Sequence, residues 1–220
     1  MLQSLFNGTI SKLDLIVLLL RIPCILLSLT VHEVSHGYAA YKLGDPTAKA
    51  LGRLDLNPLR HLDPFGTVCL LLFGFGWAKP VPINPLHFKH MKRDTAITAA
   101  AGPLSNLLLG FLGAFLCRAA SYLPYSRPAY ILMLFLSVFS LLNFGLALFN
   151  MIPIPPLDGS RILFAFLPTN AYFAVMKYER YIMIGMMILL WSGIVDLPLS
   201  GAIDSLYSLG YNLFYLFPAA

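Results

Sequence analysis

The chain has 220 residues, of which 58% are hydrophobic and only 11% charged. One soluble core of this size cannot bury so much apolar surface, so this composition excludes a soluble globular protein and predicts a membrane protein. The net charge of +5 therefore predicts no nucleic-acid partner, because in a membrane protein the positions of the basic residues relative to the spans matter more than their sum.

Four apolar windows are long enough to cross a bilayer as helices, at residues 13–31, 95–117, 130–152 and 181–197. A further apolar run at 65–77 contains three glycines and is too short for a comfortable crossing. It predicts a re-entrant or interfacial loop or a hairpin near 65–85. No repeat or polar linker divides the sequence. We therefore expect one integral membrane domain over 1–220, an all-α polytopic fold.

The basic residues are distributed unevenly between the predicted loops. Eight of the fifteen lysines and arginines lie between Lys42 and Arg93, and the loop between the second and third spans holds only Arg118 and Arg127. Three more follow the third span, at Arg161, Lys177 and Arg180. The positive-inside rule then predicts that 42–93 and 153–180 lie in the cytoplasm and that the N-terminus lies outside.

The segment HEVSH at 32–36 carries the chemistry. His32 and His36 are four residues apart, so on a helix their imidazoles share one face and can bind one divalent ion. Glu33 is rotated from His32 by about 100 degrees, which lets its carboxylate reach a metal-bound water without becoming a ligand. The alternative is that these side chains only cap a membrane helix.

A catalytic zinc usually takes a third protein ligand. Lys42 stands where a metzincin would have its third histidine, and Glu179 lies between two basic residues. Asp158 is the better candidate, because it follows three prolines that end the third span and precedes Gly159, which permits a close backbone approach. A helix-capping or turn role for Asp158 remains open.

Several segments together resemble the site-2 protease family of intramembrane zinc metalloproteases. They are HEVSH, AGPLSN at 101–106 and NMIPIPPLDG at 150–159, while GDPTAKALGRLDLNPLRHLDPFGT and GFGWAKPVPINP resemble the compact bacterial branch that lacks a PDZ domain. The resemblance covers residues 25 to 165. It implies one Zn²⁺ held by His32, His36 and Asp158, with Glu33 as the catalytic glutamate. It also implies that Asn150 lines the active site of a multi-pass protein of the bacterial cytoplasmic membrane.

Three other polar residues near the predicted cavity are candidates for positioning a substrate, at Asn57, His61 and Asn106. His61 could instead bind a metal or a proton, or it could have a purely structural role as a hydrogen-bonding residue within its loop. The two asparagines could instead form hydrogen bonds with backbone groups that lack partners where the helices are interrupted.

The expected activity is hydrolysis of peptide bonds within or next to transmembrane segments of other proteins, with Glu33 as general base on zinc-bound water. The expected partners are the transmembrane substrate and the lipid bilayer. Two other functions are possible. The protein could be a membrane metal transporter that uses His32, His36 and Asp158 as a transit site. It could also be a pseudoprotease that binds membrane proteins without cleaving them. The ligands alone do not distinguish zinc from iron or cobalt, and the oligomeric state is not predicted.

Overall fold

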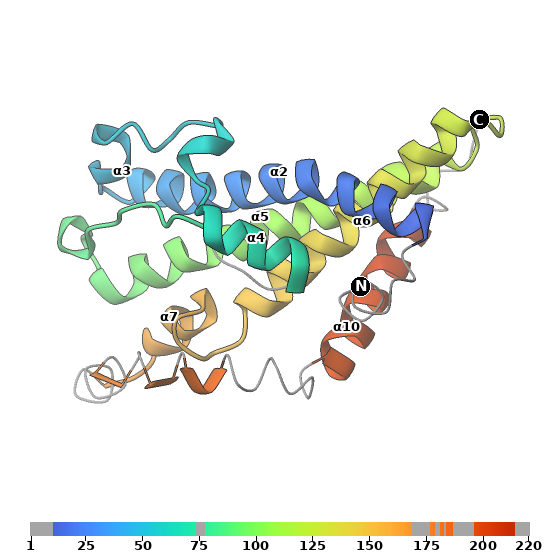
Figure 1. Cartoon of the computed structure of the whole chain (residues 1–220). Coiled ribbons are helices and arrows are strands. Elements are labelled where there is room, and N and C mark those ends of the chain that lie inside the picture. The colour runs from blue at the N-terminus through green and yellow to red at the C-terminus, as the bar shows by residue number, and fades with distance from the viewer. Residues whose placement is uncertain are drawn as a thin grey trace.

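The computed structural model describes residues 11–73, 78–168, 177–178, 181–182, 184–186 and 196–213. Three long helices lie side by side in it (Figure 1): α2 (Lys12–Lys42), α5 (Met91–Ala120) and α6 (Arg127–Asn150). Each is long and apolar enough to cross a membrane. The prediction of an all-α polytopic membrane protein is confirmed.

The three helices correspond to the first three predicted spans. The fourth predicted span, 181–197, falls mostly outside the described residues and stays a prediction. A further helix that was not predicted, α10 (Asp196–Asn212), packs against α5 and α6. Its sequence mixes polar residues and glycine with the apolar ones, which is why hydropathy alone did not indicate it.

Helix α2 extends eleven residues beyond the predicted apolar span. It begins with a capping box, in which Ser11 and Asp14 exchange backbone and side-chain hydrogen bonds. It continues through GYAAYK, whose alanines favour helix, and it ends before Gly44, whose φ of 110° suits glycine. The HEVSH segment therefore lies inside a continuous helix rather than at its end.

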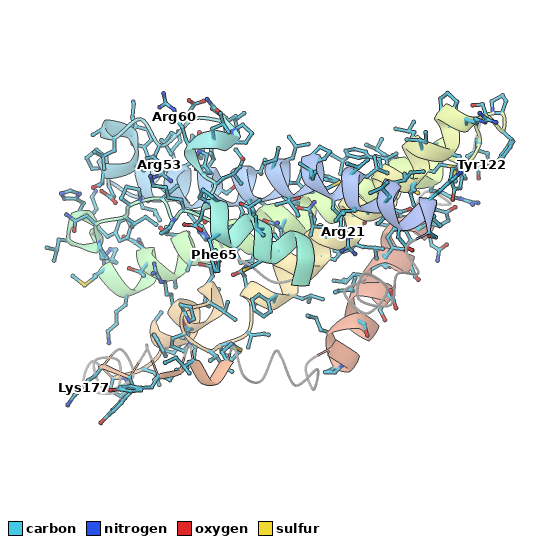
Figure 2. The ribbon with its side chains drawn as sticks, viewed as in Figure 1. Arg21, Arg53, Arg60, Phe65, Tyr122 and Lys177 are labelled. Carbon is cyan, nitrogen blue, oxygen red and sulfur yellow. The ribbon has the colours of Figure 1, made fainter. Side chains whose placement is uncertain are left out.

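Short elements connect α2 to α5 at one end of the bundle: α3 (Thr47–Ala50), η1 (Pro58–Arg60), α4 (Pro64–Phe73) and η2 (Pro85–His87). The ten residues of α4 extend only about 15 Å, too short to cross a bilayer, and a re-entrant or interfacial position for this region stays a prediction. Within the described part of 65–85, the only strand-type pairing is an isolated bridge between Leu62 and Ala78. Arg53 and Arg60 lie at this end of α2, and Tyr122 lies at the opposite end of the long helices (Figure 2).

Two kinds of contact hold the helices together. Apolar residues of α2, α4 and α6 form one cluster of Ile25, Leu29, Leu70 and Leu146. Between α5 and α6 the Phe144 ring packs directly on the α5 backbone, because a Cβ on Gly110 would lie 2.6 Å from that ring. Small residues at such contacts are typical of membrane helices, which lack a hydrophobic driving force toward each other.

Candidate metal centre

Three side chains that could hold a metal ion meet between α2 and α7 (Asp158–Phe164). The Nε2 atoms of His32 and His36 lie 3.0 Å apart, and each lies 3.2 Å from Asp158 Oδ2. The histidines share one face of α2, as their spacing predicts. Asp158 comes from a segment more than a hundred residues away, and the structure brings it to the same point.

This triangle of donor atoms fits a divalent cation. Two imidazole nitrogens and one carboxylate oxygen form a common donor set of catalytic zinc, in which bond lengths near 2.0–2.1 Å and tetrahedral angles put neighbouring ligand atoms about 3.3 Å apart. The observed edges of 3.0 and 3.2 Å are close to that value. The same donors also suit iron or cobalt.

Asp158 reaches the histidines because the chain turns sharply after α6. The prolines that follow Asn150 cannot continue the helix, and α7 then begins at Asp158 itself. A Cβ on Gly159 would lie 2.7 Å from the Ile152 carbonyl oxygen and would also collide with the Met151 backbone. Glycine therefore allows the close backbone approach predicted for this position.

Gly102 of α5 is a second glycine on which the centre depends, and sequence reasoning missed it as a site residue. A Cβ there would lie 2.6 Å from His36 Cε1 and 2.7 Å from His32 Cε1. The α5 backbone therefore forms a wall directly against both imidazoles. The signal in the sequence was a glycine and a proline inside an apolar span, at AGPLSN.

The Nδ1 atoms of both histidines have hydrogen-bond partners on α5. His36 Nδ1 donates to the Thr98 carbonyl over 2.7 Å, and His32 Nδ1 lies 2.9 Å from Asn106 Oδ1. Partners of this kind orient metal-binding imidazoles. Asn106 is 0% exposed and contacts His32, and a substrate-positioning role for it stays a prediction.

Behind Asn106 lie further buried polar groups that sequence reasoning did not single out. Asn106 Nδ2 donates to Asn143 Oδ1 over 3.1 Å, and Asn143 Nδ2 donates to Ser28 Oγ over 2.8 Å. All three residues are 0% exposed. Because they bond to one another in a packed interior, they support the position of Asn106 beside His32.

Glu33 lies beside the histidines on α2 and contacts the segment before α5. Its Oε2 accepts a hydrogen bond from the Val81 backbone over 2.8 Å. Arg53 holds the same segment by donating to the carbonyls of Lys79 and Pro80 over 3.0 and 3.4 Å. One oxygen of the Glu33 carboxylate is therefore fixed by a stretch of chain that is itself anchored.

The buried carboxylate of Asp45 anchors the other end of that segment. Asp45 accepts hydrogen bonds from the Asn84 backbone over 2.7 Å and from His87 Nδ1 over 2.8 Å, and Thr47 also donates to it. Burial alone would raise its pKa, but these donors outweigh burial and lower the pKa from 3.8 to about 2. The ionised form of Asp45 therefore stabilises this connection.

The other predicted site residues lie apart from the three ligand atoms. Asn150 donates to the Leu146 carbonyl of its own helix over 3.0 Å, and Asn57 caps η1 at the surface. His61 is fully buried, and its Nε2 donates to the Asp55 carbonyl over 2.6 Å. This is the hydrogen bond within the loop that a purely structural role of His61 predicts. Substrate-positioning roles for Asn57, His61 and Asn150 stay predictions, and Glu179 lies outside the described residues.

A surface hollow of about 490 Å³ near the end of α2 does not change this assignment. Its one carboxylate, on Asp55, already pairs with Arg60 over 3.2 Å, and the hollow contains none of the three ligands. It is lined by Tyr38, Tyr41, Lys49, Gly52, Leu54, Asp55 and Arg60.

Comparisons with known proteins point to one family. The pattern of peptidase family M50 matches residues 125–192, which include Asp158. The chain is 44% identical over 160 residues to "Putative zinc metalloprotease YwhC" of Bacillus subtilis, a match that covers 71% of this chain and 73% of that relative.

Two more relatives carry the name "Putative zinc metalloprotease Rip2". The protein from Mycolicibacterium smegmatis is 32% identical over 61% of this chain and 52% of its own length, and the one from Mycobacterium tuberculosis strain H37Rv is 28% identical over 74% and 63%. No solved structure matches the chain. The similarity to YwhC covers most of both chains, so this protein belongs to peptidase family M50, the site-2 protease family that its motifs resemble.

Proposed function

We propose that the chain is a zinc-dependent endopeptidase that cleaves other proteins within or next to their transmembrane segments. The observation that carries the proposal is the convergence of His32, His36 and Asp158 on one point within a helix bundle long and apolar enough to cross a membrane. Ionisable groups at membrane depth are costly, and they mark functional sites. Membership of a metalloprotease family supports the same conclusion.

In this proposal His32, His36 and Asp158 hold the ion through the Nε2, Nε2 and Oδ2 atoms. Zinc, when bound, supplies Lewis acidity that polarises the scissile carbonyl and makes water nucleophilic at neutral pH. The two Nδ1 contacts and the α5 backbone at Gly102 keep the imidazoles in place. The chain itself therefore supplies both the ligands and their orientation.

Glu33 is the group that moves protons. It accepts one from the attacking water and passes it to the nitrogen of the leaving amine, so that the peptide bond is replaced by a carboxyl group and an amine. Only one of its oxygens, Oε2, accepts the Val81 hydrogen bond, and among the described residues the other makes no hydrogen bond. The Val81 contact therefore positions Glu33 while leaving an oxygen for proton transfer.

Access to this centre is restricted. His32, His36 and Glu33 are 6, 7 and 9% exposed, and the Asp158 side chain is 17% exposed. A neighbouring segment must therefore move before a peptide can enter. A transmembrane helix must also unwind locally, because its backbone groups are otherwise bonded within the helix. We therefore expect helix-weakening residues in the substrate to promote cleavage.

The test is the Glu33→Gln variant in proteoliposomes that contain a generic single-span substrate. The amide oxygen of glutamine still accepts from Val81, so fold and zinc content should be retained, while loss of the base should slow cleavage by about 10²–10⁴-fold. Asp204→Asn on α10 is the matched control, since it also converts a carboxylate to an amide but leaves the centre intact. Undiminished cleavage by Glu33→Gln, or an equal loss in Asp204→Asn, would refute the proposal.

A further inference from the structure

We propose that Asn143 on α6 is a positioning residue that fixes the tautomer of His32, acting through Asn106 on α5. Nothing in the HEVSH motif determines which ring nitrogen of His32 carries the proton. A histidine binds metal through Nε2 only when the neutral ring carries its proton on Nδ1. The inference rests on the ligand assignment of the proposed function and adds the groups that make His32 a competent ligand.

The direction of the hydrogen bonds is decided at the Phe139 carbonyl, which can only accept. It lies 2.8 Å from one terminal atom of the Asn143 amide, so that atom is the nitrogen, Nδ2. The same nitrogen directs its second hydrogen to Ser28 Oγ over 2.8 Å. The remaining atom, Asn143 Oδ1, is therefore an acceptor and faces α5.

The orientation of Asn143 then determines that of Asn106. Asn143 Oδ1 lies 3.1 Å from the Asn106 amide and needs a donor, so Asn106 presents Nδ2 to it. Asn106 Oδ1 consequently faces His32 Nδ1, 2.9 Å away. Because that oxygen can only accept, Nδ1 carries the proton and the Nε2 lone pair points toward the other two ligands.

The opposite arrangement is disfavoured by burial. If the Asn106 amide were reversed, its oxygen would face Asn143 Oδ1, and two acceptors would oppose each other in the interior. Asn106, Asn143 and Ser28 are all 0% exposed, so bulk water cannot repair the mismatch.

The two histidines obtain the same protonation pattern by different means. His36 Nδ1 donates directly to the Thr98 main-chain carbonyl, which no substitution can remove. His32 depends instead on two asparagine side chains. The proposal therefore predicts that a substitution of Asn143 on α6 affects His32 and leaves His36 unchanged.

The test uses the full chain, ¹⁵N-labelled at histidine, in detergent micelles with a chelator and in mildly alkaline buffer. Nitrogen chemical shifts report which ring nitrogen is protonated, independently of zinc and of proteolysis. We expect wild-type His32 to be the Nδ1–H tautomer. In Asn143→Leu the Asn106 amide is free to reverse, so the Nε2–H form should appear at His32, and zinc affinity should fall by about tenfold.

Ser140→Ala is the matched control. Ser140 is also fully buried on α6 and also donates to α5, at the Gly110 carbonyl over 2.7 Å, but it lies outside the path to His32. It should cost stability without changing the tautomer or zinc affinity. Ser28→Ala should also retain the tautomer, because Phe139 still orients Asn143.

Three results would overturn the inference. They are an Nε2–H tautomer in the wild type, an unchanged His32 tautomer in Asn143→Leu, and an equal loss of zinc affinity in Ser140→Ala. The first of these results would overturn the inference even if Asn143→Leu does not fold. These results do not depend on the proposed proteolysis, because the tautomer is observed without a substrate. A protein that fails to cleave can therefore still confirm or refute this inference.

Discussion

Replacing Gly102 by alanine would put a methyl group where the imidazoles of the metal centre now lie. The new Cβ would be 2.6 Å from His36 Cε1 and 2.7 Å from His32 Cε1, whereas ordinary contact begins at 3.4 Å. The helix and the rings must therefore separate by at least about 0.8 Å, because His36 Nε2 would lie even closer to the new Cβ, and metal–ligand distances tolerate only about 0.2 Å. We expect Gly102→Ala to lose most of its zinc.

The matched control is Gly110→Ala, two turns along the same helix. Its Cβ would lie 2.6 Å from the Phe144 ring, so the overlap is nearly as large but the neighbour is no ligand. Overpacking costs about 1–3 kcal/mol, and the gain in helix propensity offsets about 1 kcal/mol of it. Both variants should therefore lose at most about 2 kcal/mol of unfolding free energy, small enough to leave them folded.

Zinc bound per chain, measured on purified protein by elemental analysis, and thermal unfolding in detergent separate the two effects. Gly102→Ala should lose zinc, and Gly110→Ala should retain it at similar stability. If Gly102→Ala bound zinc as tightly as the wild type, or if both variants lost it equally, the close approach of α5 would not be what positions the ligands.

Two further predictions concern the aspartates. Asp158→Asn should lose zinc while remaining folded, because a neutral amide oxygen is a poor zinc ligand, and elemental analysis that found full zinc occupancy would exclude Asp158 as a ligand. Asp45→Asn should lower the free energy of unfolding by about 2 kcal/mol at neutral pH, since the pKa of Asp45 is about 2 instead of 3.8. That contribution is present above about pH 4 and is lost as the pH falls through about 2. Thermal unfolding at a series of pH values measures the stability difference between variant and wild type. A difference that did not shrink in acid would contradict the role of the Asp45 carboxylate.

Much of the fold could be predicted because membrane helices are determined by local composition. A run of about 20 apolar residues must be helical in lipid, so the spans that became α2, α5 and α6 were found from hydropathy alone. Helix α2 runs eleven residues past the predicted span, since apolarity marks the edge of the hydrocarbon and not the end of the helix. The helix itself continues to Lys42, just before Gly44.

The metal centre, too, could be predicted from the sequence only in part. His32, Glu33 and His36 are neighbours on one helix, so their spacing in the sequence already determines their geometry. Asp158 could be reached by elimination and by resemblance, because acids are rare in this chain. Its position 3.2 Å from both imidazoles, however, depends on the turn after α6 and on how α7 packs.

Only the tertiary structure decided which residues surround the ligands. Gly102, Asn106 and Asn143 lie on two other helices, and their contacts with His32 or with one another depend on how α5 and α6 rotate and approach α2. Sequence reasoning placed Asn106 near a cavity and did not single out Asn143. A sequence by itself determines relations within one helix, because the helical repeat converts spacing into direction, whereas relations between helices arise only when side chains pack.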